Sequence, residues 1–178
     1  MPCVLNTGVT LDCRTSLGGV KSVYIGSTTG QAITISGEAN GVITGVTAQG
    51  GTINITSVAD LTTSGMFEFQ QPRQSASLSE TGAFSEENGT AFYTSVLSFV
   101  VNTLEGEKLD TLNVLGQNTR LVVIVLDQND RYWILGNASG AIVTASTSET
   151  GTAFGDRSGI TIEATGLSPQ PMYELNIS

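Results

Sequence analysis

The 178-residue sequence contains no histidine. This absence excludes Ser-His-Asp and Cys-His nucleophilic pairs and every zinc or iron site that uses imidazole. Cys3 and Cys13 are too few for a four-ligand zinc site or a disulfide scaffold. We interpret them as free thiols of a cytosolic protein, with one disulfide as the alternative. No phosphate-binding glycine loop followed by Lys and Ser or Thr is found. We therefore predict that the protein is not an enzyme, and we expect no catalytic residue, no metal and no cofactor.

Positive charge and long apolar runs are also scarce. The chain has 7 Lys and Arg against 16 Asp and Glu, a net charge of -9 and a pI of about 4.2. This charge balance argues against direct binding to nucleic acid phosphates or to an anionic membrane. It is compatible with a surface that must not bind DNA. No segment reaches the roughly 18 apolar residues of a membrane span, and the start of the chain lacks the features of a signal peptide. We therefore expect no membrane anchor.

Glycine is abundant, with 21 residues, and only 13% of the chain is charged. Together with many Ser and Thr residues, this composition is typical of a β-rich, turn-rich protein. The length indicates a single domain over residues 1–178, with residues 1–20 as an N-terminal arm. Residues 57–65 are interpreted as a loop. Short apolar or alternating segments predict strands at residues 20–25, 33–36, 42–46, 52–56, 66–70, 141–144, 160–163 and 172–177.

Residues 75–101 predict a long β-hairpin, with two strands joined across residues 85–89. The first strand is polar, and the second becomes apolar toward its end. We expect the tip of such a hairpin to be exposed to solvent and its base to be buried. A polar hairpin that projects from a domain is either solvated or used to contact a partner.

Residues 105–116 predict the one helix of the chain. Leu109, Leu112 and Leu115 form an apolar stripe, and acidic residues at its start suit the helix dipole. Gly116 is predicted to end the helix. A helix of about three turns is not stable alone in water, so we expect it to lie against a sheet.

Residues 119–136 predict a central hairpin. The first strand, residues 121–126, is apolar without alternation, and the second carries Trp133, the single Trp of the sequence. A strand that is apolar on both faces must be covered on both faces. The core of the domain supplies one cover. The other could be a packed helix or a neighbouring subunit.

Several clusters admit a functional interpretation, and for each we favour a structural one. Residues 127–130 partly match a calcium loop but lack its Gly and distal Glu, so we interpret them as a hairpin turn. The carboxylates at 86–87 and at 105–110 are interpreted as solvated rather than catalytic. Residues 155–159 are interpreted as a tight turn held by an Asp side chain. Tyr132-Trp133 is interpreted as core or interface packing rather than a ligand platform.

Five segments in the second half of the chain carry packing and turn patterns in a recognisable order: RLVVIV (120–125), DRYWILG (130–136), GAIVT (140–144), GTAFGD (151–156) and PMYEL (171–175). In this order they resemble the tail tube proteins of long-tailed bacteriophages, especially those of crAss-like phages. The resemblance extends from Phe92 to Leu175, about half of the chain. Where the family often has Asn-Gly at the tip of the central hairpin, this chain has Asn129-Asp130.

The resemblance implies a mainly β protein, an antiparallel β-sandwich or barrel of tail-tube type with one short flanking helix at about 105–116. It implies that six copies form a ring and that rings stack into a hollow tube. Sheets of neighbouring subunits would join into one barrel, and a neighbour would supply the second cover of residues 121–126. An acidic lumen would let DNA pass without binding.

On this basis we predict a structural virion protein of a phage tail, made in the cytoplasm of a host bacterium. Its partners would be other copies of itself and other tail proteins, such as a sheath, a terminator, a baseplate and a tape measure. Ring-to-ring contacts are expected from the N-terminal arm and from residues 57–65 and 80–91. The residues predicted at subunit interfaces are Leu121, Val123, Val125, Trp133, Glu86, Glu87 and Asn88.

Two other functions remain as alternatives. A tail terminator or a head–tail connector of related fold would assemble into a single ring that does not stack. A carbohydrate-binding or adhesion β-sandwich is the second alternative. The single Trp argues against that class, because sugar sites favour exposed aromatic side chains.

Overall fold

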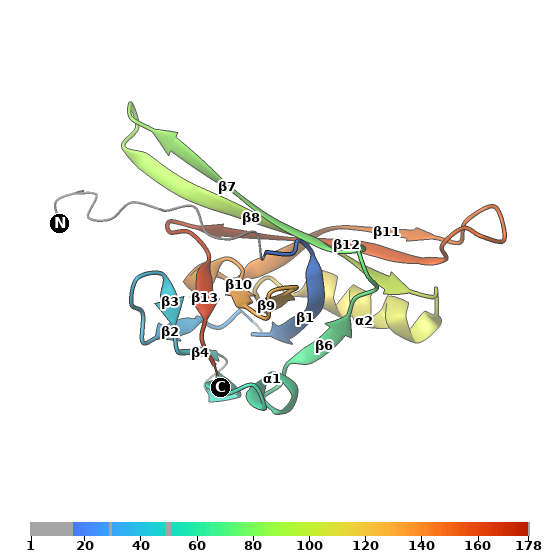
Figure 1. Cartoon of the computed structure of the whole chain (residues 1–178), viewed down its shortest axis with the longest axis horizontal. Coiled ribbons are helices and arrows are strands. Elements are labelled where there is room, and N and C mark those ends of the chain that lie inside the picture. The colour runs from blue at the N-terminus through green and yellow to red at the C-terminus, as the bar shows by residue number, and fades with distance from the viewer. Residues whose placement is uncertain (1–15, 29, 49–50, 178) are drawn as a thin grey trace.

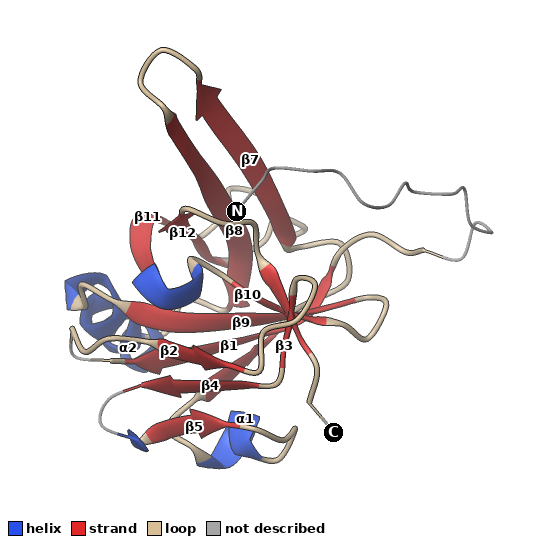
Figure 2. Ribbon diagram, turned by 90° about the vertical axis from the view of Figure 1, so that its left-hand side faces the viewer, coloured by secondary structure: helices blue, strands red, loops and turns tan. Residues whose placement is uncertain are grey.

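The structure, a computed structural model, describes residues 16–28, 30–48 and 51–177. Cys3, Cys13 and most of the predicted N-terminal arm lie outside the described residues. Strands dominate the fold and lie in three layers, visible from two directions in Figures 1 and 2. The prediction of a mainly β protein with a short flanking helix is confirmed.

The first layer is a group of four long antiparallel strands. In spatial order they are β11 (Ala141–Glu149), β12 (Gly159–Ser168), β8 (Thr90–Asn102) and β7 (Ser77–Ser85). β7 and β8 form the hairpin expected over residues 75–101, and its tip extends well beyond the body of the molecule (Figure 1). Near the base of this hairpin, Leu97 and Phe99 are fully buried, whereas the tip is exposed.

The central layer contains the strand on which the sequence analysis depended. Its strands, in spatial order, are β6 (Phe67–Gln70), β1 (Val20–Ser27), β9 (Leu121–Asp127), β10 (Tyr132–Ile134), β13 (Tyr173–Leu175) and β3 (Val42–Ile43). All pairs are antiparallel except β13 and β3, so the sheet is mixed rather than antiparallel throughout. β6 pairs only with β1. The alternation of residues 66–70 predicts that Phe67 and Phe69 point inward and Glu68 outward, but Phe67 is 70% exposed on this edge strand.

The first and central layers are two parts of one 10-stranded sheet. They join where Ala141 of β11 pairs with Leu121 of β9, after a 3-10 turn, η2 (Asn137–Ser139). Gly136 enters this turn with a φ of +66°, and a Cβ atom there would lie 2.0 Å from the Gly140 carbonyl oxygen. Glycine is therefore required where the chain passes from one layer to the next.

The third layer is a 3-stranded sheet of β2 (Thr34–Ser36), β4 (Gly45–Ala48) and β5 (Ile53–Ile55). It is followed by α1 (Asp60–Thr63), which lies in a segment predicted to be a loop. The Asp60 carboxylate accepts hydrogen bonds from the backbone N–H groups of Thr56 and Ser57 at 2.9 and 2.8 Å, and Leu61 is buried. These local hydrogen bonds and the burial of Leu61 explain the short helix. Its sequence has no apolar periodicity that would predict a helix.

The predicted helix is α2 (Gly106–Gln117), which packs against β11. Leu115 is buried and Leu112 contacts the core, as the stripe predicted, but Leu109 is 42% exposed. Gly116 does not end the helix. The helix ends at Asn118, which has an extended backbone and donates a side-chain hydrogen bond to the Val114 carbonyl at 2.8 Å.

β9 is covered on both faces by its own chain. Leu121, Val123 and Val125 face a core that the first layer closes, in contact with side chains such as Phe99 and Ile162. Val122 and Ile124 face a second core. The third layer closes that second core with Val46, Ile53, Ile55 and Leu61.

This arrangement corrects the central inference from the sequence. The five residues from Leu121 to Val125 are all 0% exposed in the single chain, and β9 pairs with β1 on one side and with β10 on the other. No neighbouring subunit is needed to cover the strand. Leu121, Val123 and Val125 are core residues, so they are not available as contacts at a subunit interface.

Ile124→Ala tests the importance of this double burial for stability. We expect the free energy of unfolding to fall by about 2–5 kcal/mol, because truncation leaves a cavity between two layers. Ile142→Ala is the matched control, since Ile142 lies on the outer face of β11 and is 46% exposed. Its change should stay within about 0.5 kcal/mol. Urea unfolding followed by circular dichroism measures both, and equal losses would contradict the assignment of β9 to the core.

Candidate assembly surface

The four-stranded first layer has two open edges among the described residues. β7 pairs only with β8. β11 pairs with β12 along its length and touches β9 only at Ala141, with a bulge between Val143 and Ala145. Neither edge strand contains Lys or Pro, which commonly protect exposed edges from pairing. Both edges therefore offer unpaired backbone groups to another strand.

The face of this layer that points away from the core is rich in Ser and Thr, and Arg157 of the β11–β12 loop donates its guanidinium N–H to the Thr161 hydroxyl on this face, at 2.9 Å. None of its four strands contains Lys or Arg. The Thr144 and Thr165 hydroxyl groups lie 3.2 Å apart across two strands, and Glu163 is exposed on β12. By register this face carries Ser77, Ser79, Thr81, Thr94, Ser98, Thr147, Glu149, Thr161, Glu163 and Thr165. It also carries the apolar residues Ala83, Phe92, Val96, Val100, Ile142, Ala145 and Leu167, of which Phe92, Ile142 and Leu167 are exposed.

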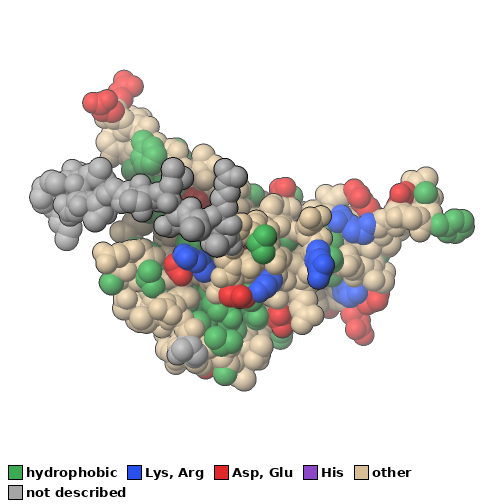
Figure 3. Space-filling view, in the orientation of Figure 1, with side chains coloured by type: hydrophobic (Ala, Val, Ile, Leu, Met, Phe, Trp, Pro, Cys, Tyr) green, Lys and Arg blue, Asp and Glu red, His purple; other side chains and the backbone are tan. Residues whose placement is uncertain are grey.

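The tip of the β7–β8 hairpin holds three of the predicted interface residues. Glu86, Glu87 and Asn88 are exposed in the turn, where the Asn88 N–H donates to the Ser85 hydroxyl at 3.3 Å. The acidic residues stand out at one extremity of the molecule in Figure 3. They have no basic partner among the described residues, which agrees with their interpretation as solvated side chains.

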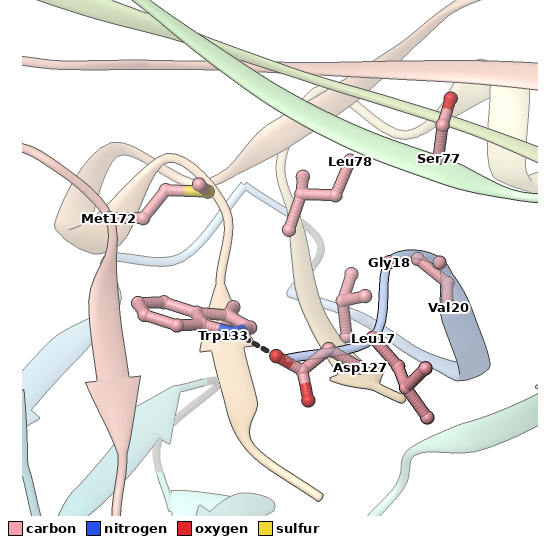
Figure 4. A pocket seen from close by; sticks show the side chains of 10 residues that line it. Leu17, Gly18, Val20, Ser77, Leu78, Asp127, Trp133 and Met172 are labelled. Carbon is pink, nitrogen blue, oxygen red and sulfur yellow. Dashed lines mark hydrogen bonds between the residues drawn. The ribbon is translucent and has the colours of Figure 1, made fainter. Parts of the chain in front are cut away.

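Trp133, another predicted interface residue, lines a cavity of about 320 Å³ between the first and central layers. Its indole N–H donates to the Asp127 carboxylate at 3.1 Å, and Leu78 and Met172 lie across the cavity (Figure 4). The cavity also contacts Val125, but not the hairpin tip. The structure therefore does not bring the predicted interface residues into one surface.

The turn after β9 is held by the Asp127 side chain. The Asp127 carboxylate accepts backbone hydrogen bonds from Asn129 at 2.7 Å and Arg131 at 2.9 Å. Burial raises the pKa of Asp127, but the N–H donors of Arg131, Trp133 and Asn129 outweigh it and hold the pKa below its ordinary value. Asp130 forms an ion pair with Lys21. No group of three or more potential metal ligands occurs in the part of the chain that the structure describes.

The loop between β11 and β12 contains a turn held by an Asp side chain, but the turn spans residues 152–156 rather than the predicted 155–159. The Asp156 carboxylate accepts hydrogen bonds from the backbone N–H groups of Thr152 at 2.9 Å and Ala153 at 2.7 Å. These bonds lower the pKa of Asp156.

The turn presents Phe154 with its side chain fully exposed at the end of the molecule opposite the hairpin tip.

Local sequence patterns do not single out the two edge strands or Phe154. The absence of Lys and Arg from β7, β8, β11 and β12 gave no signal, because among the other described strands only β1 contains such a residue, Lys21. Pairing between segments far apart in the chain decides which strands end a sheet. That information is not local, so the edges became visible only in the fold.

Comparisons with known proteins add little to this geometry. No protein-family model and no curated protein matches the chain. The chain is similar to a chain in the cryo-EM structure of the anti-feeding prophage baseplate, 6-fold symmetrised, with 12% identity and a TM-score of 0.33. The match covers 93% of this chain and 99% of that chain. A TM-score this low does not establish a common fold.

No helix among the described residues has the length and apolar character needed to span a membrane.

Asp127→Asn tests the role of this carboxylate in the central hairpin. At pH 7 we expect the free energy of unfolding to fall by about 1–2 kcal/mol, because a neutral amide accepts weaker hydrogen bonds than a carboxylate. The folded pKa is lowered, so this stabilisation is present above the unfolded value of about 3.9 and is lost as the pH falls through the folded pKa.

The difference between Asp127→Asn and the wild type should therefore shrink when urea unfolding is repeated below pH 3. Asp130→Asn, which removes only an exposed ion pair, serves as the control and should cost less than about 1 kcal/mol. A difference for Asp127→Asn that stays constant with pH would refute the role of its charge.

Proposed function

We propose that this protein is a tail tube subunit, whose copies join through the open edges of the first layer into a ring and stack into a hollow conduit for DNA. The observation that carries the proposal is the four-stranded layer β11-β12-β8-β7, with two unprotected edges and no Lys or Arg in its strands. In a ring, β7 of one copy would pair with β11 of the next. The joined layers would then form a continuous barrel around the lumen.

The strand directions suit this closure. Neighbouring strands in the layer are antiparallel, so β7 and β11 run in opposite directions. Rotation about a ring axis preserves direction along that axis, so β7 of one copy meets β11 of the next in the antiparallel sense. Every strand in the closed barrel would then be antiparallel to both neighbours, whatever the number of copies.

The stagger of the strands also suits a barrel. β7 lies against residues 90–98 of β8, and β11 lies, through β12, at the level of residues 95–102. The centres of the two edge strands are displaced by about four to five residues. We place the centre of β7 in one copy level with the centre of β11 in the next. The displacement within each copy then accumulates over its four strands, and with about 3.4 Å per residue and about 4.8 Å between strands it gives a strand tilt of roughly 40°. Closed barrels have tilts of about 35–45°.

The outer face would become the wall of the lumen. Ser and Thr dominate it, and its charged residues by register are Glu149 and Glu163. The two carboxylates outnumber the Arg157 guanidinium that contacts Thr161, so this face repels phosphate and DNA could slide through without being held. The charge of the whole chain, -9, is consistent with this use.

The proposal retains part of the predicted interface. Glu86, Glu87 and Asn88 remain proposed contacts between subunits, and Trp133 lies beneath the β7 edge, where a neighbour would approach. A terminator or connector of related fold would share the ring but not stack. Proposed further partners are a sheath, a terminator, a baseplate and a tape measure, and the proposed location is the virion tail.

Proline substitution in β11 tests the edge pairing. Adjacent residues in a strand direct their N–H groups to opposite edges, so one of Ser146 and Thr147 donates toward β12 and the other toward the open edge. Proline removes the N–H group, so one of Ser146→Pro and Thr147→Pro blocks the open edge and leaves the pairing with β12 intact. The variant that keeps its wild-type circular dichroism and thermal stability should remain monomeric in analytical ultracentrifugation at concentrations where the wild type forms rings. Ser146→Ala and Thr147→Ala are the controls and should form rings. If the proline variant that folds normally still forms rings, pairing through β11 is ruled out.

Charge reversal in the proposed lumen tests the conduit. Tubes carrying Glu149→Lys and Glu163→Lys should bind short duplex DNA, with an affinity that falls steeply as salt increases. Glu107→Lys with Asp110→Lys makes the same change of charge on the exposed side of α2 and is the matched control. Fluorescence anisotropy of labelled DNA with assembled tubes measures both. Equal DNA binding by the two double variants would show that the outer face of the first layer does not line the channel.

A further inference from the structure

The first layer carries two projections that point to opposite ends of the molecule. The β7–β8 hairpin extends from one end, and the loop between β11 and β12 extends from the other (Figure 1). Both projections carry exposed aromatic side chains close to their tips. An apolar projection at each end of one sheet is the arrangement expected for contacts between successive copies along an axis.

At one end, Phe154 is presented on a braced turn. Asp156 holds the backbone N–H groups of Thr152 and Ala153, and its own N–H donates to the Ala153 carbonyl at 3.0 Å. Gly151 has a φ of +71°, and a Cβ atom there would lie 2.5 Å from the Cβ of Asp156. The local structure therefore fixes the loop, yet Phe154 contributes no burial to its own chain. In Figure 3 an apolar side chain forms this extremity of the surface.

At the other end, an aromatic pair lies on the projecting half of the hairpin. The rings of Phe84 and Tyr93 meet edge to face, with centroids 5.6 Å apart and an angle of 83°. They lie over Gly82, where an added Cβ would come within 2.9 Å of Phe84 and 3.0 Å of Tyr93. β12 ends at Ser168, opposite Tyr93, so the strand pairing stops where this pair begins. Phe84 is 69% exposed.

The hairpin tip is acidic, and the opposite end offers one guanidinium, that of Arg157, in a pocket that the carboxylates of Glu149 and Asp156 also line. Glu86 and Glu87 are exposed at the hairpin tip, and the β7–β8 hairpin contains no Lys or Arg. At the opposite end, Arg157 is exposed in the same loop as Phe154, and its guanidinium donates to the Thr161 hydroxyl at 2.9 Å. The Asp156 carboxylate, in contrast, is occupied by the N–H donors of its own loop. Arg157 therefore offers a counter-charge to the tip.

We infer that ring stacking is built from this pair of ends: Phe154 of one copy packs against Phe84 and Tyr93 of a copy in the next ring, with Arg157 beside Glu86 and Glu87. The inference rests on the proposed ring. The contact joins two different surfaces of the same chain, so it does not close on itself and continues as a filament. The occupant of each aromatic surface is therefore a second copy of this protein.

The test compares Phe154→Ser and Phe84→Ser with the wild type. Both side chains are exposed, so folding and ring formation should be unchanged. Each stacking contact loses the burial of one Phe, about 1.5–3 kcal/mol, which corresponds to a roughly 10- to 150-fold weaker contact. Tubes should require at least about tenfold more protein, measured by sedimentation and by tube length in negative-stain micrographs. Phe67→Ser is the matched control, since Phe67 is 70% exposed on β6, away from both ends, and its tubes should match the wild type.

Two further measurements sharpen the assignment. With Cys3 and Cys13 replaced by Ser, Phe154→Cys combined with Phe84→Cys should give disulfide-linked ladders across rings when tubes are oxidised. Arg157→Glu should leave rings that do not stack, and adding Glu86→Lys and Glu87→Lys should restore tubes.

The outcomes separate this inference from the proposed function. Rings without tubes for both Phe variants, beside normal tubes for Phe67→Ser, are the expected result. Normal tubes with Phe154→Ser, or tubes without the disulfide ladder, overturn the stacking contact and leave the tube assignment standing. Wild-type rings that never stack overturn the contact and indicate a terminator or connector. A wild-type protein that forms no rings removes the proposed function and the inference with it.

Discussion

The burial of β9 on both of its faces is the constraint that organises this molecule. Val123 and Ile124 are consecutive residues, both fully buried, and they belong to two different cores. A strand of this kind needs a layer on each side. The chain supplies one layer from its long C-terminal and central hairpins and the other from the short strands and α1 near its start. The three-layer architecture follows from that requirement.

This internal shelter determines which surface remains for assembly. Because the chain covers its own apolar strand, contacts between copies must use other features, and the first layer provides them. Its inner face is committed to the core, but its outer face and two edges have no partner among the described residues. An open sheet edge is ordinarily a liability that proteins protect. This layer has two unprotected edges, with compatible strand directions and a barrel-like stagger. Pairing of each edge with the opposite edge of a neighbouring copy accounts for both.

Much of the fold was predictable from local patterns. The β7–β8 hairpin and α2 were located within one or two residues, because alternation, a turn cluster and a leucine stripe are properties of neighbouring residues. Local patterns failed where tertiary pairing decides exposure. Phe67 was expected inward because it alternates with Glu68, but β6 lies at an edge where its outer face meets no layer. Leu109 belongs to an apolar stripe, yet the sheet beneath α2 reaches only Leu112 and Leu115.

The sequence by itself determined that the chain is β-rich, acidic and without histidine, and that residues 121–126 are apolar on two faces. Composition and periodicity are sums over single residues and short windows, so no fold is needed to read them. Only the tertiary structure decided what covers that strand, which strands end the sheet, and that Phe154 and Phe84 lie at opposite ends. These facts depend on contacts between residues far apart in the chain. A one-dimensional pattern can state that an apolar face must be covered, but it cannot state by which segment.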